Sequence, residues 1–302
     1  MKLVYVLFLT LSFSLTANAQ LANYMQTFKQ SGAQYPEQEA GLLANATTGT
    51  LLKAMTPFYS DSAQTVRSKA YYLTYRKAMS APLAEQILAI SKLLEGCADV
   101  SSIVVGQNIS YLKNFSLSTF DDQSMQFLLQ LLHKPHAFHY KQLVMMAGYI
   151  GVGKSLFQQK LLQPDDIPAD VRWAMQLALA RMGNTASLDA CLAVIKKAPL
   201  GNETVECLIP DIIYMRQKKG IDYCIEILND PRTLCMSADP DKSVRIMCSY
   251  RIMEFLSPVV ADFPYKTDAS GSLVARSYEE ALLNVREWFV SHPNYSLHSD
   301  KY

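Results

Sequence analysis

The clearest pattern of hydrophobic and polar positions lies between residues 170 and 195, and it predicts two consecutive helices. In the first half, apolar side chains recur every three or four residues, at Val171, Met175, Ala178, Leu179 and Met182. Gly183 and Asn184 interrupt this pattern, and Ser187 is expected to cap the second helix. The apolar positions of that helix are Leu188, Cys191, Leu192 and Ile195. We therefore predict a helix–turn–helix pair with one apolar face.

This helix pair recurs along the chain. The stretch AGYIGVGKSL, which begins at Ala147, aligns with LARMGNTASL 32 residues downstream, so that Gly151 corresponds to Gly183. The stretch LDACLAVI aligns with IDYCIEIL a further 33 residues downstream, so that Cys191 corresponds to Cys224. A period of this length is typical of stacked two-helix repeats.

A second recurring signature, D-x4-V-R, supports the same period. It ends at Arg67, Arg172 and Arg245, and a weaker copy that begins at Asp99 lacks the arginine. With the alignments above, it marks units that start near residues 66, 104, 139, 171, 205 and 244. Because the Asp and Arg recur with the repeat, we expect them to cap helices and to pair between units, not to act in catalysis.

The pattern around residue 171 resembles the HEAT-like repeats, related to armadillo repeats, that are grouped with the phycobilisome-lyase type. The resemblance covers about residues 60–260 and implies a right-handed α-solenoid of about six two-helix repeats. It implies no chemistry, because such repeats occur in many unrelated proteins. The residues assigned a structural role in the repeat are Asp166, Val171, Arg172, Gly183, Asp239 and Arg245.

The rest of the chain is expected to close the two ends of this all-α fold. Residues 20–60 would form an N-terminal helical cap, with helices near 21–31 and 36–55, and residues 61–265 would hold the repeats. A loop at 266–272 would precede a last helix at 277–292, and the tail from 293 to 302 is expected to fray. The only strand-like run of note, SSIVV at 101–105, lies where a repeat helix should start.

The first 19 residues have the features of a Sec-type signal peptide. Lys2 precedes an apolar run from Leu3 to Leu15, and Ala17 and Ala19 occupy the small-residue positions of a cut after Ala19. No later stretch is long and apolar enough to span a membrane. We therefore expect a protein exported to the periplasm or outside the cell.

Charge and cysteine content narrow the function classes. Without Lys2, the remaining chain has 27 basic and 27 acidic residues, a balance that argues against nucleic-acid binding and against a polybasic membrane clamp. There are six cysteines, most of them among apolar residues of predicted helices. We favour mostly buried thiols, with a disulfide framework as the alternative that export would allow.

The segment Gly148–Ser155, GYIGVGKS, matches the phosphate-loop pattern G-x-x-x-x-G-K-[ST] at every fixed position. A working phosphate loop follows a strand and places its lysine, here Lys154, on the phosphates. Here the preceding segment repeats as a helix in the next unit. We interpret the motif as a glycine-rich turn between repeat helices, with Ser155 as an N-cap, and keep nucleotide binding as a less favoured alternative.

Three histidines, His133, His136 and His139, lie close together and form the alternative metal site. Pro135 breaks any helix between them, and carboxylate or thiolate partners are not obvious nearby, whereas a structural zinc site needs about four ligands. An inter-repeat loop is the favoured interpretation.

No catalytic motif and no cofactor motif is recognised, so we expect a non-catalytic protein without a cofactor that binds an unidentified protein partner. The second helices of the units near 139, 171 and 205 would present the binding surface. The residues predicted to be exposed on it are Gln159, Asp189, Asp222, Tyr223 and Glu226. A metalloprotein or enzyme that uses the histidine cluster is the alternative.

Overall fold

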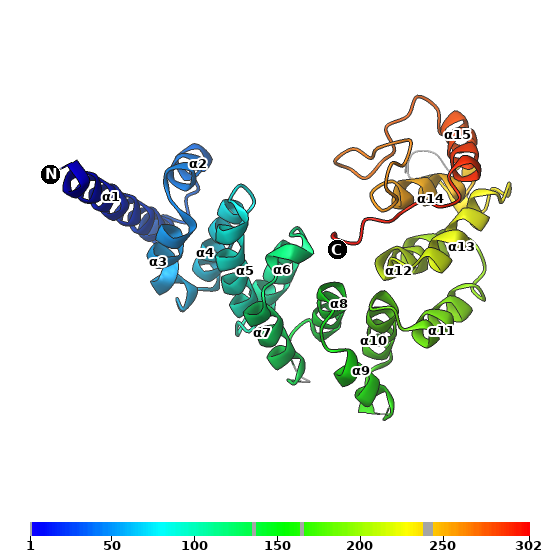
Figure 1. The fold of residues 1–302 in the computed structure, drawn as a ribbon, viewed down its shortest axis with the longest axis horizontal. Helices are drawn as coiled ribbons and strands as arrows, with labels where there is room; N and C mark the ends of the chain where they lie inside the picture. The colour runs from blue at the N-terminus through cyan, green and yellow to red at the C-terminus, as the bar shows by residue number, and fades with distance from the viewer. Residues whose placement is uncertain (1, 135–136, 164–165, 238–243) are drawn as a thin grey trace. The chain divides into compact units, whose positions relative to one another are not determined.

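The computed structural model describes residues 2–134, 137–163, 166–237 and 244–302. Within these residues, regular structure consists of fifteen α-helices, short 3-10 and π turns and one two-stranded sheet, which confirms the all-α fold class (Figure 1). None of the described helices combines the length and the apolar character needed to cross a membrane. The chain divides into two compact units, 1–146 with 301–302 and 147–300.

The N-terminal region of unit 1 holds three helices, α1 (Lys2–Ser31), α2 (Pro36–Asn45) and α3 (Thr48–Tyr59). The prediction of a single helix over 36–55 was wrong, because Ala46 adopts an extended backbone conformation that separates α2 from α3. The Thr47 side chain then caps α3 by accepting a hydrogen bond from the Thr50 amide. The chain can therefore fold α2 back onto α1 and α4.

A buried ion pair joins the first two of these helices to α4 (Gln64–Ala78). The Lys69 ammonium donates to Glu39, which also accepts a 2.9 Å hydrogen bond from the Tyr24 hydroxyl. The rings of Tyr24, Phe28 and Tyr72 surround the same ammonium, with centroids 5.8, 5.6 and 4.9 Å from Nζ. Burial, and then the bond to Glu39, raise the pKa of Tyr24 to about 12. One buried charge pair thus holds α1, α2 and α4 together.

Helices α4, α5 (Leu83–Gly96) and α6 (Ser102–Leu112) follow one another and pack in sequence. The strand-like run at 101–105 forms the start of α6. Arg67 at the start of α4 donates two 2.8 Å hydrogen bonds to the Asp99 carboxylate, which precedes α6, and both side chains are buried. This is the Asp–Arg pairing that the sequence predicts between successive helix pairs. Unit 1 continues through η1 (Leu117–Thr119) and α7 (Asp122–Leu132) into α8 (Tyr140–Ile150).

Unit 2 contains two further predicted pairs and the second helix of a third. These are α9 (Lys154–Leu161), α10 (Ala169–Arg181) with α11 (Thr185–Ile195), and η3 (Thr204–Leu208) and α12 (Ile209–Met215) with α13 (Lys218–Leu228). Cys191 and Cys224 both lie at the seventh residue of their helices and are fully buried, as their alignment predicts.

The glycine turns of α8 and α10 are equivalent in detail. Gly151 and Gly183 have φ values of 87° and 81°, a left-handed conformation that favours glycine. In each turn the residue after the glycine donates to the carbonyl five residues before it, the Schellman pattern of a helix end. The predicted cap at Ser187 was wrong, because the Asn184 side chain caps α11 by accepting from the Ser187 amide at 2.9 Å.

The prediction that a helix pair starts near residue 244 is wrong. The valines that mark the earlier units, Val66, Val104, Val171 and Val205, are buried, but Val244 is 57% exposed. Arg245 lies in β2 (Arg245–Ile246), which pairs antiparallel with β1 (Cys235–Met236). Asp239 lies outside the described residues, and Asp166 is exposed.

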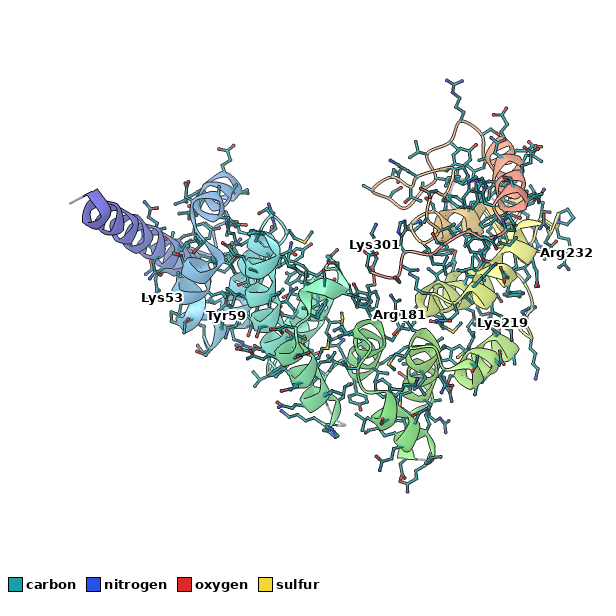
Figure 2. The ribbon with its side chains drawn as sticks, viewed as in Figure 1. Lys53, Tyr59, Arg181, Lys219, Arg232 and Lys301 are labelled. Carbon is teal, nitrogen blue, oxygen red and sulfur yellow. A yellow bond between two sulfur atoms is a disulfide. The ribbon has the colours of Figure 1, made fainter. Side chains whose placement is uncertain are left out.

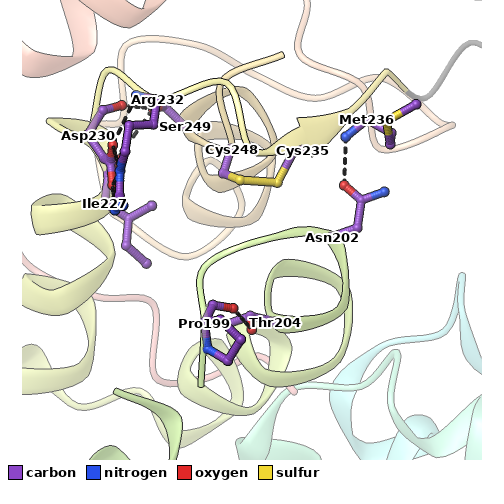
Figure 3. The surroundings of a disulfide bond; sticks show 10 residues. All are labelled: Pro199, Asn202, Thr204, Ile227, Asp230, Arg232, Cys235, Met236, Cys248 and Ser249. Atoms are coloured by element: carbon purple, nitrogen blue, oxygen red, sulfur yellow. Dashed lines mark hydrogen bonds and ion pairs between the residues drawn. A yellow bond between two sulfur atoms is a disulfide. The ribbon is translucent and has the colours of Figure 1, made fainter. Parts of the chain in front are cut away.

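A disulfide between Cys235 and Cys248 closes this hairpin, 13 residues apart in sequence (Figure 3). The Met236 amide donates a 2.7 Å hydrogen bond to the Asn202 side chain, which ties the hairpin to the loop before η3. Cys97, Cys191 and Cys224 are buried thiols, as expected, and Cys207 is an exposed one. Burial raises the pKa of Cys191 and Cys224 to about 12, so neither is a reactive thiolate.

The C-terminal part contains α14 (Ser249–Leu256) and α15 (Tyr278–Ser291), and α15 confirms the predicted last helix. The Ser277 side chain caps it and accepts from the Glu280 amide. The following tail differs from the expected frayed end. The Ala261 amide donates to the Ser296 carbonyl, and the His298 amide donates to the Val259 carbonyl. These two bonds pair the tail with the chain after α14.

Replacement of Lys69 by Ala should lower the free energy of unfolding by about 3–5 kcal/mol, because Glu39 would stay buried without its partner. Equilibrium denaturation with urea measures this. The matched control is Lys53→Ala, since Lys53 is exposed on α3. The double variant Lys69→Met, Glu39→Gln should recover most of the loss. Equal effects of Lys69→Ala and Lys53→Ala would show that the ion pair does not hold these helices.

Removal of the disulfide by the double variant Cys235→Ser, Cys248→Ser should cost about 2–4 kcal/mol, because the unfolded chain gains conformational freedom. Denaturation of both proteins with and without reductant measures the loss. Reductant should destabilise only the unmodified chain. Cys207→Ser is the matched control and should change nothing, because Cys207 is exposed and unpaired with another cysteine. Identical midpoints for the double variant and the unmodified chain would contradict the disulfide.

Candidate partner-binding surface

The five residues predicted to form a partner-binding surface lie at the surface of second helices in unit 2. Gln159 on α9, Asp189 on α11 and Glu226 on α13 are exposed as predicted, whereas Asp222 and Tyr223 on α13 are half-buried. Among the described residues, no side-chain hydrogen bond or ion pair joins Gln159 to the other four. The structure therefore brings together four of the five residues, on two adjacent helices.

Lysines of the neighbouring helix neutralise the acids of this surface. Lys219 of α13 forms a 2.5 Å ion pair with Asp189 of α11 (Figure 2 labels Lys219). Lys196, at the end of α11, lies 3.6 Å from Glu226 and 4.7 Å from the centroid of the Tyr223 ring. Because these pairs are exposed, each contributes little to stability. The residues Asp189, Lys219, Lys196, Tyr223 and Glu226, here called the charged row, therefore carry two positive and two negative charges.

Asp222 has a different environment, because it fixes the C-terminal tail. Its carboxylate accepts a 2.7 Å hydrogen bond from the Tyr295 hydroxyl and lies 2.9 Å from the Lys218 ammonium. That ammonium also lies over the Tyr295 ring, 4.3 Å from its centroid. Burial, and then the bond to Asp222, raise the pKa of Tyr295, so the hydroxyl stays protonated and donates at neutral pH.

A groove of about 310 Å³ opens beside Asp222, between α13, α15 and the tail. Half of the ten residues that line it are apolar, and Val290 is 83% exposed. The lining residues are Lys218, Asp222, Ile225, Leu228, Asn229, Arg286, Phe289, Val290, Pro293 and Tyr295. Among them, only Asp222 is predicted from the sequence to be a site residue, because the sequence predicts α15 as an end cap and the tail as frayed.

Arg286 is the cation of this groove that has no carboxylate partner among the described residues. Its Nε donates a 2.7 Å hydrogen bond to the Leu228 carbonyl at the end of α13. No hydrogen bond from its Nη1 or Nη2 to a described residue is present. The guanidinium is therefore held through its Nε, and Arg286 is one of the residues that line the groove.

The predicted histidine cluster is only partly within the described residues. His136 lies outside them, and His133 is exposed at the end of α7. The His139 Nε2 lies 2.9 Å from the Ser102 carbonyl oxygen and 3.0 Å from its hydroxyl. Among the described residues, no three His, Cys, Asp or Glu side chains are grouped to hold a metal ion. His139 thus packs against α6.

The segment that matches the phosphate loop joins two helices, α8 and α9, so no strand precedes it. Gly148 lies inside α8, where a Cβ would come within 2.3 Å of the Tyr214 hydroxyl and 2.6 Å of the Ala178 Cβ. The predicted N-cap at Ser155 was wrong. Gly153, with φ of 84°, takes that position, and Ser155 follows in the first turn. The glycines of the motif therefore serve helix packing and turn geometry.

Comparisons of this chain with protein-family models, with curated proteins and with solved structures gave no match.

Gly148→Ala should lower the free energy of unfolding by about 1–3 kcal/mol, because the added methyl group overpacks the contact with Ala178 and Tyr214. Lys154→Ala should leave stability within about 0.5 kcal/mol, since the side chain is exposed. Thermal unfolding with and without Mg-ATP measures both. A phosphate loop would give the opposite result, with stabilisation by Mg-ATP that Lys154→Ala abolishes.

Proposed function

We propose that this chain is an exported, non-catalytic α-solenoid protein that binds a protein partner through the surface of α11 and α13. The observation that carries the proposal is the charged row of Asp189, Lys219, Lys196, Tyr223 and Glu226, whose two ion pairs and one cation–ring contact link α11 to α13. Charged pairs and an aromatic ring at the rim of an interface give orientation and specificity more than affinity.

The solenoid part of the proposal extends the helix pairs to a right-handed stack of HEAT-like repeats. It is supported by the matched turns at Gly151 and Gly183 and by the equivalent buried positions of Cys191 and Cys224. The ion pair of Arg67 with Asp99 joins two successive helix pairs of unit 1. Repeats of this kind contact mainly their neighbours and expose long surfaces, which suits a scaffold.

The export part of the proposal is supported by the disulfide between Cys235 and Cys248, which fits an oxidising compartment outside the cytoplasm. Downstream of a cut after Ala19, Leu21, Tyr24, Met25 and Phe28 are buried in the core, so the remaining part of α1 keeps these packing contacts.

The proposal predicts that a purified exported chain begins at Gln20 and co-purifies with one dominant protein after mild cross-linking in its native envelope. Mass spectrometry reads both the N-terminus and the partner. Asp189→Lys should weaken this capture, because it places a second ammonium group beside Lys219 and gives the charged row a net positive charge. Capture of no protein under several conditions would overturn the scaffold function.

A charge swap separates binding from folding in that experiment. The double variant Asp189→Lys, Lys219→Asp restores the ion pair in the opposite direction. If Asp189 contacts the partner, the swap should bind as poorly as the single variant. If the single change only disturbs α11 and α13, the swap should restore capture and exclude Asp189 from the binding surface.

A further inference from the structure

We infer that the groove between α13, α15 and the tail binds the C-terminal carboxylate of a peptide together with its apolar last side chain. This inference rests on the proposed partner-binding function and names the chemistry of the segment that the partner would offer. The groove is built entirely from unit 2 and adjoins the charged row through Asp222.

The charge of the groove favours a single negative charge. Lys218 and Arg286 contribute two positive charges, and Asp222 contributes one negative charge. Asp222 and Lys218 pair with each other, so Arg286 supplies the uncompensated charge. A carboxylate can accept two parallel hydrogen bonds from a guanidinium, which is the strongest pairing available to such a site. A doubly charged phosphate would be repelled by Asp222 at close range.

The position of Arg286 suits this role. The 2.7 Å bond from its Nε to the Leu228 carbonyl restrains the Arg286 side chain before any ligand arrives. Fewer rotamers are then lost on binding, so less conformational entropy opposes it. The Nη1 and Nη2 groups have no hydrogen-bond partner among the described residues and are available to an incoming carboxylate.

The apolar part of the groove suits one side chain. Ile225, Phe289, Val290 and Pro293 lie beside the charged groups, and Val290 is largely exposed. A volume of about 310 Å³ is at the lower end of the roughly 300–1,000 Å³ that ligand pockets have. There is room for a terminal residue and its carboxylate. Asn229 also lines the groove, and its Nδ2 donates a 3.1 Å hydrogen bond to the Ile225 carbonyl.

The test uses the full chain from Gln20 and two N-acetylated tetrapeptides of sequence Ala-Ala-Ala-Leu, one with a free carboxylate and one with a C-terminal amide. Isothermal calorimetry measures both. The free-carboxylate peptide should bind about tenfold more tightly, because only it can form the charge-assisted pair with Arg286. Equal binding of the two peptides, or saturation by neither at millimolar concentration, would overturn the inference.

Variants locate the site. Arg286→Gln should abolish the preference for the free carboxylate, and Val290→Asp should weaken the same peptide about tenfold. Val290→Asp also guards against misfolding, because that side chain is exposed and its loss leaves the core intact. Lys53→Gln, at an exposed lysine of α3 that belongs neither to the groove nor to the charged row, is the matched control and should bind normally. A carboxylate preference that survives both groove variants would place the site elsewhere and overturn the assignment.

The two proposals can fail separately. A partner captured equally by the unmodified chain and by Arg286→Gln, with no peptide binding, would overturn the groove assignment and leave the scaffold function in place. Binding of the free-carboxylate peptide without any captured partner would support the groove and overturn the scaffold function.

Discussion

An apolar helix face must be buried against another element, and in this chain successive helices provide most of that contact. Within unit 1, α3, α4, α5 and α6 pack consecutively for this reason, and α1 covers the face that α3 and α4 would otherwise expose. The charged groups between these helices are buried with their partners, as Arg67 is with Asp99 and Lys69 with Glu39. A buried pair contributes less through net attraction than through the cost of breaking it, so it fixes the register of its helices.

The same constraint shapes the end of the helix pairs in unit 2. The buried face of α13 includes Ile221, Cys224 and Leu228, and no further pair of the same kind follows it within residues 229–237 and 244–302. Instead, α14 and α15 pack on α13, and the disulfide-closed hairpin precedes α14. Sequence positions that would have formed a helix turn form two short strands. The tail then pairs with the chain after α14 and brings Tyr295 to Asp222. The groove exists because this closing arrangement leaves space between α13, α15 and the tail.

Helices and turns that depend on neighbouring residues could be predicted from the sequence. Contacts between residues that are distant in the sequence could not. The helix pairs follow from apolar spacing, and the turns at Gly151 and Gly183 follow from the need for a left-handed backbone. Capping was mislocated at Ser187, because Asn184, three residues earlier, offers a side-chain oxygen to the same turn.

The D-x4-V-R signature shows the limit of local patterns most clearly. At Arg67 it opens a helix and provides a contact to Asp99, but at Arg245 the same letters form a strand. The strand at Arg245 belongs to the hairpin that the Cys235–Cys248 disulfide closes, and the local pattern does not contain this bond. The groove was equally hidden, since Lys218 and Arg286 are far apart in sequence and neither lies in a recognisable motif.

The charged row and the groove differ in one physical respect that decides how each can act. In the row, Lys219 and Lys196 already compensate Asp189 and Glu226, so a partner gains little by replacing one exposed pair with another. In the groove, the Nη1 and Nη2 groups of Arg286 have no acceptor among the described residues, and apolar side chains line the same groove. A ligand there gains a new charge-assisted pair and buries apolar surface at the same time. If one partner covers both, the row would set its orientation and the groove would supply most of its affinity.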